Sequence, residues 1–153
     1  MVVDGRYRVQ SKLGAGAVGE VYEVFDLSEE KTLALKLAVP DLNREEATTF
    51  QREFHTLAGI SHPNIVSVHD YGVTPEGRQY FTMELIQGHK FDSTFKDDIN
   101  TILSAICDVL AALDFLHSKG LVHCDLKPEN ILVSRSREAP NTKLLDFGLA
   151  GSS

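Results

Sequence analysis

The order of apolar and polar positions predicts a chain that begins with a small antiparallel sheet. Its first half contains short runs rich in valine, leucine and aromatic residues, the composition that suits a pleated surface. The connections between these runs are too short for parallel crossovers, so neighbouring strands are expected to be antiparallel. Five strands are predicted, at residues 7–13, 20–26, 31–37, 65–71 and 79–84.

Helical spacing appears twice. Residues 43–59 place Ala47, Phe50 and Leu57 on one stripe, and Asn43 with Glu46 has the pattern of a capping box. Residues 97–119 carry a broader apolar stripe and stop at a glycine, which predicts a long helix that packs in a core. Short strands are expected around a polar segment further on, at 121–122, 131–134 and 142–145.

These elements describe an α+β fold in two parts. Residues 1–85 form a five-stranded antiparallel sheet with one helix, and residues 86–153 are the helical start of a larger part. We expect the boundary between the parts to follow the strand at 79–84.

Charge and composition narrow the class of protein to which the chain can belong. The 153 residues include 15 basic and 22 acidic side chains, a net charge of −7, which disfavours nucleic acid or an anionic membrane as the main partner. No apolar run approaches the roughly 20 residues of a membrane span, and the first residues lack a secretory pattern. Cys107 and Cys124 are interpreted as reduced thiols, which favours a cytoplasmic protein.

Residues 14–19, Gly-Ala-Gly-Ala-Val-Gly, match the pattern G-x-G-x-x-G. A glycine-rich hairpin turn without a ligand is an equally good interpretation of these six residues alone. A dinucleotide fold requires a helix after the third glycine, and a Walker loop requires lysine followed by serine or threonine. Glu20 and Val21 follow instead and begin a strand. The phosphate-binding design left is a glycine flap between antiparallel strands, with its lysine on a later strand.

The next strand supplies such a lysine. Alternation places Ala34 and Lys36 on one side and Leu33, Leu35 and Leu37 on the other. A lysine on an inward face needs a counter-charge, because burying it alone is costly. Glu53 lies on the inward stripe of the following helix and is predicted to be the partner.

Two further segments complete the set of motifs, His-Cys-Asp-Leu-Lys-Pro-Glu-Asn at 123–130 and Asp-Phe-Gly at 146–148. With the glycine loop, the Ala-Leu-Lys lysine, the helix glutamate and Met83-Glu84-Leu85, they appear in the order of one family. The chain resembles the N-terminal part of a eukaryotic-type (Hanks-type) serine/threonine protein kinase. The resemblance covers nearly all of the sequence and implies the protein-kinase-like fold.

The resemblance implies ATP and Mg²⁺ as cofactors and a serine or threonine of a protein as the acceptor. It implies that Lys36 binds the α- and β-phosphates and that Glu53 holds this lysine in place. Asp146 and Asn130 are then the ligands of Mg²⁺, for which oxygen donors are suited. Asp125 accepts the proton of the substrate hydroxyl, and Lys127 neutralises the transferred γ-phosphoryl group.

The resemblance also implies a set of nucleotide-binding residues. Glycine-loop residues would cover the phosphates, one bulky residue would be the gatekeeper, and two backbone groups after it would bind adenine. Apolar side chains would enclose the base. These residues are Gly14, Ala15, Gly16 and Gly19 of the loop, the gatekeeper Met83, the backbone of Glu84 and Ile86, and Val21, Ala34 and Leu132 around the base.

Two departures from the family shape the expectations. Cys124 stands where many members have an arginine that pairs with a phosphorylated activation loop, which suggests control that does not depend on that phosphate. The sequence also stops a few residues after Gly148, so we expect a truncated kinase with weak or no phosphotransfer and with any regulatory domains downstream. A non-catalytic ATP-binding or scaffolding module and a small-molecule kinase of related fold stay open as alternatives.

Overall fold

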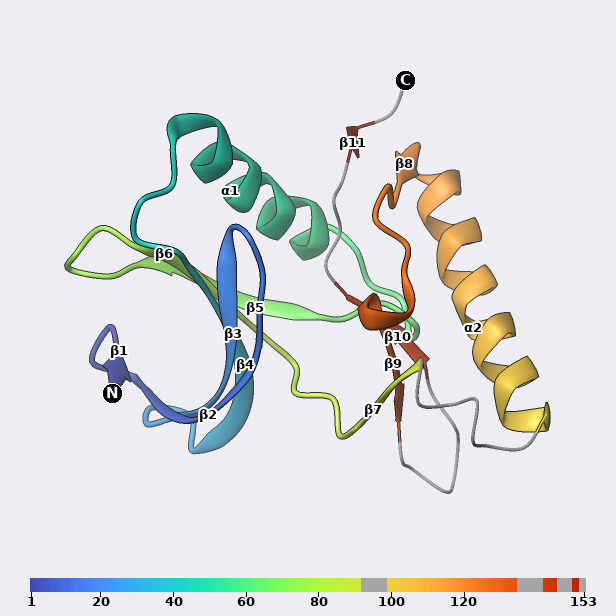
Figure 1. The fold of residues 1–153 in the computed structure, drawn as a ribbon, viewed down its shortest axis with the longest axis horizontal. Helices are drawn as coiled ribbons and strands as arrows, with labels where there is room; N and C mark the ends of the chain where they lie inside the picture. Colours follow the sequence, from blue (N-terminus) through green and yellow to red (C-terminus); the bar gives the residue numbers. More distant parts are fainter. Residues whose placement is uncertain (92–98, 135–141, 146–149, 152–153) are drawn as a thin grey trace. The chain divides into compact units, whose positions relative to one another are not determined.

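The computed structural model describes residues 1–91, 99–134, 142–145 and 150–151, and its chain divides into two compact units (Figure 1). The first unit contains residues 1–60 and 67–85, and the second contains residues 61–66 and 86–153. The Asp-Phe-Gly motif at 146–148, the expected helix start at 97–98 and the segment 135–141 lie outside the described residues. Residues 61–66 thus group with the second unit, although the sequence pattern assigned them to the first part.

The first unit is an antiparallel sheet with one helix, as the sequence predicts. The five expected strands are present, and a two-residue strand at the N-terminus adds a sixth to the sheet. The spatial order is β1-β2-β3-β4-β6-β5. The elements are β1 (Val2–Val3), β2 (Tyr7–Ala15), β3 (Gly19–Asp26), β4 (Lys31–Ala38), α1 (Arg44–Ala58), β5 (Val68–Val73) and β6 (Gln79–Met83).

Alternation along β4 separates the two faces of this sheet. Leu33, Leu35 and Leu37 belong to a buried cluster with Tyr7 and Tyr80. The rings of Tyr7 and Tyr80 meet edge to face with their centroids 5.7 Å apart. The other face carries the side chains that α1 covers, so one strand contributes to an apolar cluster and to a polar site without mixing them.

The N-terminal hairpin packs at the face of the sheet that carries Leu35. Asp4 and Gly5 both have positive φ, 50° and 66°, which is the geometry of a type I′ turn. Arg6 makes two hydrogen bonds to the fully buried Asp26, of 2.9 and 2.7 Å, and the Tyr80 hydroxyl donates to Asp4 at 2.6 Å. These contacts fasten β1 and its turn to β3 and β6.

Helix α1 begins with the capping box that the sequence predicts. The Asn43 side chain accepts from the Glu46 backbone N–H, and the Glu46 carboxylate accepts from the Asn43 backbone N–H, both at 2.9 Å. Its buried residues are Phe50, Glu53 and Leu57, one stripe of the helix. The helix packs against β5 and β6.

The second unit combines one long helix with two small sheets. A three-stranded sheet has the order β10-β9-β7, and β11 pairs with β8. The elements are β7 (Gly88–Lys90), α2 (Ile99–Ser118), β8 (Leu121–Val122), the 3-10 helix η2 (Pro128–Asn130), β9 (Ile131–Ser134), β10 (Thr142–Leu144) and β11 (Ala150–Gly151).

Thr142 joins three distant parts of the second unit. Its backbone N–H donates to Asp108 of α2 at 3.0 Å, and its carbonyl accepts from the buried Asn64 side chain at 3.0 Å. Ile65 forms a parallel bridge with Leu144, which explains why β5 begins only at Val68 and not at 65. The strand predicted at 65–71 is therefore shorter, because Ile65 pairs with Leu144 within the second unit.

Strand β7 was not predicted from the sequence. It pairs with β9, and Gly88 lies opposite Ser134. A Cβ at Gly88 would lie 2.8 Å from the carbonyl carbon of Val133 and closer still to its oxygen. Glycine at this position therefore allows the two backbones to approach.

Helix α2 is long and apolar enough to cross a membrane by length and composition, with a mean hydropathy of 1.8. The expectation that no apolar run approaches a membrane span fails here. Polar residues interrupt the run, but the mean hydropathy of the helix stays high enough to meet the criterion. Asp108 lies within the helix and binds the backbone of Thr142, as in a helix packed within its own unit. An exposed apolar stripe remains on the helix, formed by Ile99, Leu103, Ile106 and Leu110.

Candidate active site

The first unit brings Lys36 and Glu53 together. Strand β4 presents Lys36 toward α1, where Nζ lies 3.1 and 3.0 Å from the two carboxylate oxygens of Glu53. Both residues are buried, 7% and 8% exposed. A buried ammonium is tolerated because the carboxylate compensates its charge, and removal of either partner would leave an uncompensated charge.

Aromatic rings complete the surroundings of this pair. Lys36 Nζ lies 5.8 Å from the ring centres of Phe50 and of Phe81, a distance suited to cation–π attraction. The two rings contact each other with centroids 5.2 Å apart. Phe81 is the register partner of Lys36 on β6, so sheet pairing and helix packing both fix the position of the ammonium group.

The glycine loop lies between β2 and β3. Gly16 donates its backbone N–H to the carbonyl of Gly19 at 2.8 Å, which closes the turn. A Cβ at Gly19 would lie 3.0 Å from the Leu37 carbonyl oxygen, so a side chain there would pack tightly against β4. A Cβ at Gly14 would meet nothing within 4 Å among the described residues. Packing therefore accounts for Gly19, whereas Gly14 leaves open space beside the loop.

The predicted nucleotide residues are distributed over both units. Val21 is the register partner of Lys36, and Ala34 is the partner of Met83, so these four lie on adjacent strands of the first sheet. Glu84 is fixed by Ser67 through both its backbone N–H and its side chain, at 2.9 and 3.0 Å.

Three more of the predicted nucleotide-binding residues can be assigned to a unit. Ala15 ends β2 in the first unit, opposite Glu20. Ile86 and Leu132 belong to the second unit.

The second unit brings Asp125, Lys127 and Asn130 together. The Asn130 amide nitrogen donates to the Asp125 backbone carbonyl at 2.9 Å and to its carboxylate at 3.2 Å. Lys127 Nζ lies 3.6 Å from the same carboxylate. Asn130 is buried, whereas Asp125 and Lys127 are exposed, so a buried amide orients an accessible carboxylate.

His123 connects this segment to the residue before Asp146. The Asp125 backbone N–H donates to His123 Nδ1 at 3.2 Å, which assigns the proton of the neutral ring to Nε2. Nε2 lies 3.2 Å from the Leu145 carbonyl, and the Leu145 N–H donates to the Asn130 carbonyl at 2.8 Å. Leu145 is therefore held from both sides, while Asp146 itself lies outside the described residues.

The donor chemistry of Asn130 fits a hard cation. Its two contacts with Asp125 both use the amide nitrogen, which turns the carbonyl oxygen away from that residue. Amide and carboxylate oxygens are suitable donors for Mg²⁺. Among the residues that the structure describes, no group of three or more His, Cys, Asp or Glu side chains is arranged to hold a metal.

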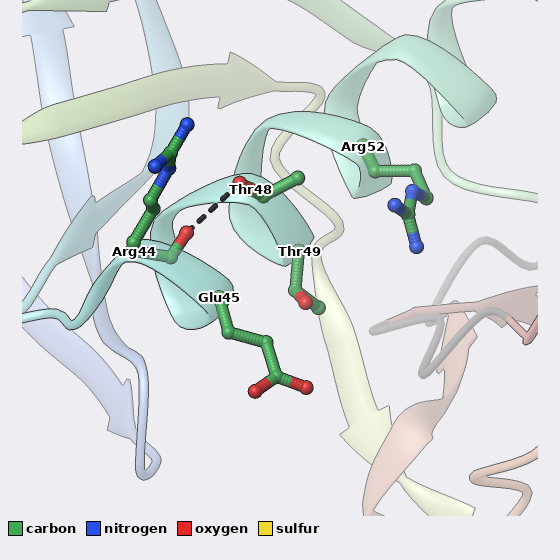
Figure 2. Close-up of a pocket in the computed structure, with 5 residues that line it drawn as sticks. All are labelled: Arg44, Glu45, Thr48, Thr49 and Arg52. Carbon is green, nitrogen blue, oxygen red and sulfur yellow. Dashed lines mark hydrogen bonds between the residues drawn. The ribbon is translucent and has the colours of Figure 1, made fainter.

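A surface hollow lies elsewhere, on the outer side of α1 (Figure 2). Arg44, Glu45, Thr48, Thr49 and Arg52 line it. The Thr48 hydroxyl is already used, because it donates to the Arg44 carbonyl at 2.8 Å. None of the predicted site residues lines this hollow, and Glu53 lies on the buried stripe of the same helix.

Comparison with known proteins identifies the class. The protein kinase domain family matches residues 7–153, and the chain belongs to this family. The family uses ATP with a divalent metal ion.

Curated relatives are about one third identical to this chain over the matched residues. Serine/threonine-protein kinase pkn3 of Myxococcus xanthus is 36% identical over 152 residues, which cover 95% of this chain and 28% of the relative. Serine/threonine-protein kinase pkn2 of the same organism is 34% identical, over 98% of this chain and 19% of the relative. Serine/threonine-protein kinase PknA of Mycobacterium tuberculosis is 36% identical, over 98% and 36%. The chain thus spans about a third or less of these relatives.

Sequence reasoning missed some contacts around the site. His123 begins one motif and Leu145 directly precedes another, and only the folded chain shows the hydrogen bond that joins them. Glu20, Lys12 and Tyr22 form a polar cluster below the glycine loop that no motif marks. A signal for that cluster was present, since Glu20 and Tyr22 are two apart on one strand and so share a face.

Proposed function

We propose that this chain binds ATP with Mg²⁺ and carries the catalytic loop of a serine/threonine protein kinase, which transfers the γ-phosphoryl group to a protein hydroxyl. The observation that carries this proposal is the buried pair of Lys36 and Glu53 beside a glycine loop. Phosphoryl transfer depends on positioning and on charge neutralisation, and both require an ammonium group held at one place.

The pair is suited to that task for an electrostatic reason. Glu53 contacts Lys36 with both oxygens, and the rings of Phe50 and Phe81 restrict the lysine further. A fixed ammonium group needs little reorganisation when phosphate oxygens approach it. Gly14 has open space where a side chain would stand, which lets backbone N–H groups approach an anion.

The catalytic loop supports the transfer step. Asp125 is exposed and is oriented by the Asn130 amide, which supports its role as the acceptor of the proton of a substrate hydroxyl. Lys127 lies beside it and supplies a positive charge near the transferred group. Asn130 and Asp146 would hold Mg²⁺, which when bound neutralises charge that develops on the phosphate oxygens.

Nucleotide binding provides the first test. We expect Lys36→Met to weaken binding of Mg²⁺-ATP at least tenfold, roughly 1.4 kcal/mol. Asp125→Asn should change the affinity less than twofold, because this carboxylate serves the acceptor. Circular dichroism of both variants controls for folding. Unchanged affinity in a folded Lys36→Met variant would refute the proposal.

Phosphotransfer provides the second test. With labelled ATP, any transfer by the chain is expected to reach serine and threonine hydroxyls and to be lost in Asp125→Asn. Lys127→Ala should reduce the rate and leave nucleotide binding intact. Labelling that persists in Asp125→Asn would contradict the role assigned to this residue.

The thiols agree with a reducing compartment. Cys107 and Cys124 are both free and exposed, and exposed free thiols are typical of proteins that stay in the cytoplasm. We propose a cytoplasmic location for the kinase domain on this ground. Cell fractionation of the native protein checks it.

A further inference from the structure

Three polar side chains meet on one face of the β2–β3 hairpin, opposite to the face of Val21. Lys12 Nζ lies 2.7 Å from one oxygen of Glu20, and the Tyr22 hydroxyl donates to the other oxygen at 2.6 Å. Each carboxylate oxygen of Glu20 thus has its own partner. We call these residues the Lys12–Glu20–Tyr22 cluster.

The cluster spans an irregular point of the hairpin. Lys12 is the register partner of Tyr22, but the next partners are Gly14 and Val21, so Leu13 is an extra residue on β2. A bulge of this kind interrupts the ladder and bends the strand. Lys12 reaches diagonally past it to Glu20, at the base of the glycine loop. The ion pair therefore links the strand before the bulge to the strand that leaves the loop.

A third element faces the same carboxylate. Arg78 precedes β6 and donates Nε to the Ala38 carbonyl at 2.8 Å, at the end of β4. The hydrogen bonds from Lys12 and Tyr22 lower the pKa of Glu20, and the charge of Arg78 lowers it further. Polar contacts thus extend from the β2 and β3 ends that carry the glycine loop to the neighbouring ends of β4 and β6.

We propose that Glu20, held by Lys12 and Tyr22, is a positioning residue that fixes the glycine loop over the phosphates of a bound nucleotide. This inference rests on the proposed function. Glycine loses more conformational freedom on ordering than other residues, so a glycine loop orders only at a cost. An ion pair at its base orders the loop before the ligand arrives and so strengthens phosphate binding. Adenosine lacks phosphates, so this ion pair should not change its affinity.

The test compares a non-hydrolysable ATP analogue with adenosine on the 153-residue chain at low salt. Glu20→Ala and Lys12→Ala should each weaken the triphosphate about two- to fivefold, the range of exposed ion pairs, without changing adenosine binding. Lys12→Arg keeps the ion pair and should restore the preference. Lys31→Ala is the matched control, because it removes an exposed ion pair with Glu29 at the other end of β3 and β4.

Amide exchange of the ligand-free chain provides a readout that is independent of nucleotide. The N–H groups of Gly16 and Val39 donate to loop carbonyls at 2.8 and 3.0 Å and should exchange faster in Glu20→Ala. Unchanged exchange, or equal weakening of both ligands, would overturn the positioning role. A wild-type chain that binds neither ligand would overturn the proposed function and the nucleotide role of Glu20 with it, while exchange still shows whether Glu20 orders the loop.

Discussion

Replacement of Asp26 by asparagine should lower the free energy of unfolding at neutral pH by about 2 kcal/mol. The two hydrogen bonds from Arg6 hold the pKa of this buried carboxyl at about 2, against an ordinary value of 3.8. Each pKa unit corresponds to about 1.4 kcal/mol, which gives the expected loss. Asparagine keeps one side-chain oxygen, which can still accept from Arg6 Nε and the Ser28 backbone N–H, but places an amide NH2 where the second oxygen accepts from Arg6 Nη2. The change therefore removes the charge together with that hydrogen bond.

The pH dependence has a definite direction. Because folding lowers the pKa of Asp26, its contribution is complete above the unfolded value near 3.8 and disappears as the pH falls toward 2. The stability difference between the wild-type chain and Asp26→Asn should therefore be constant from pH 7 to about 5. It should then shrink steadily in more acidic solution.

Urea unfolding followed by tyrosine fluorescence measures this difference, since the chain has no tryptophan and Tyr7 and Tyr80 lie in the affected cluster. Asp70→Asn is the matched control. Asp70 also approaches Arg6, at 3.5 Å, but is half exposed, so its removal should cost less than about 1 kcal/mol. The reasoning fails if Asp26→Asn costs no more than this control or if its effect does not diminish in acid.

Four further substitutions, one of them paired with a conservative control, test packing and helix capping. Gly88→Ala should destabilise the second unit, because its Cβ would collide with the backbone of β9. Gly14→Ala should leave stability unchanged and weaken only ATP binding. Thermal melts measure the first effect, and titrations with ATP measure the second. Leu35→Ala removes a fully buried side chain and should cost about 2–5 kcal/mol in urea unfolding. Asn43→Ala should cost about 1 kcal/mol through loss of the α1 cap, while Asn43→Asp retains it.

Alternation and capping made most of the first unit predictable. On β4 the period of two separates Leu35 from Lys36, and the structure places them in the apolar cluster and beside Glu53. Strand β1 was missed although Asp4-Gly5 is a strong hairpin signal, because two residues are too few to show periodicity. Strand β7 was missed because its pairing depends on close backbones and not on a side-chain pattern.

In the candidate site, too, the sequence predicts some contacts and misses others. Motif spacing alone pointed to Asp125 with Asn130, because they are five positions apart and a short turn joins them. The contact between Lys12 and Glu20 spans a register shift at Leu13. A shift of register leaves no mark in composition or spacing, so this part of the loop's support could be seen only in the folded chain.

The bond between Asn64 and Thr142 has a consequence for the order of synthesis. It joins positions 78 residues apart, and the last two strands of the first unit, β5 and β6, are translated between them. Closure of so long a segment is slow, because non-local contacts must wait for both ends. On the ribosome, β1 to β6 are complete before Thr142 emerges, so the sheet of the first unit can form while Asn64 still awaits its partner.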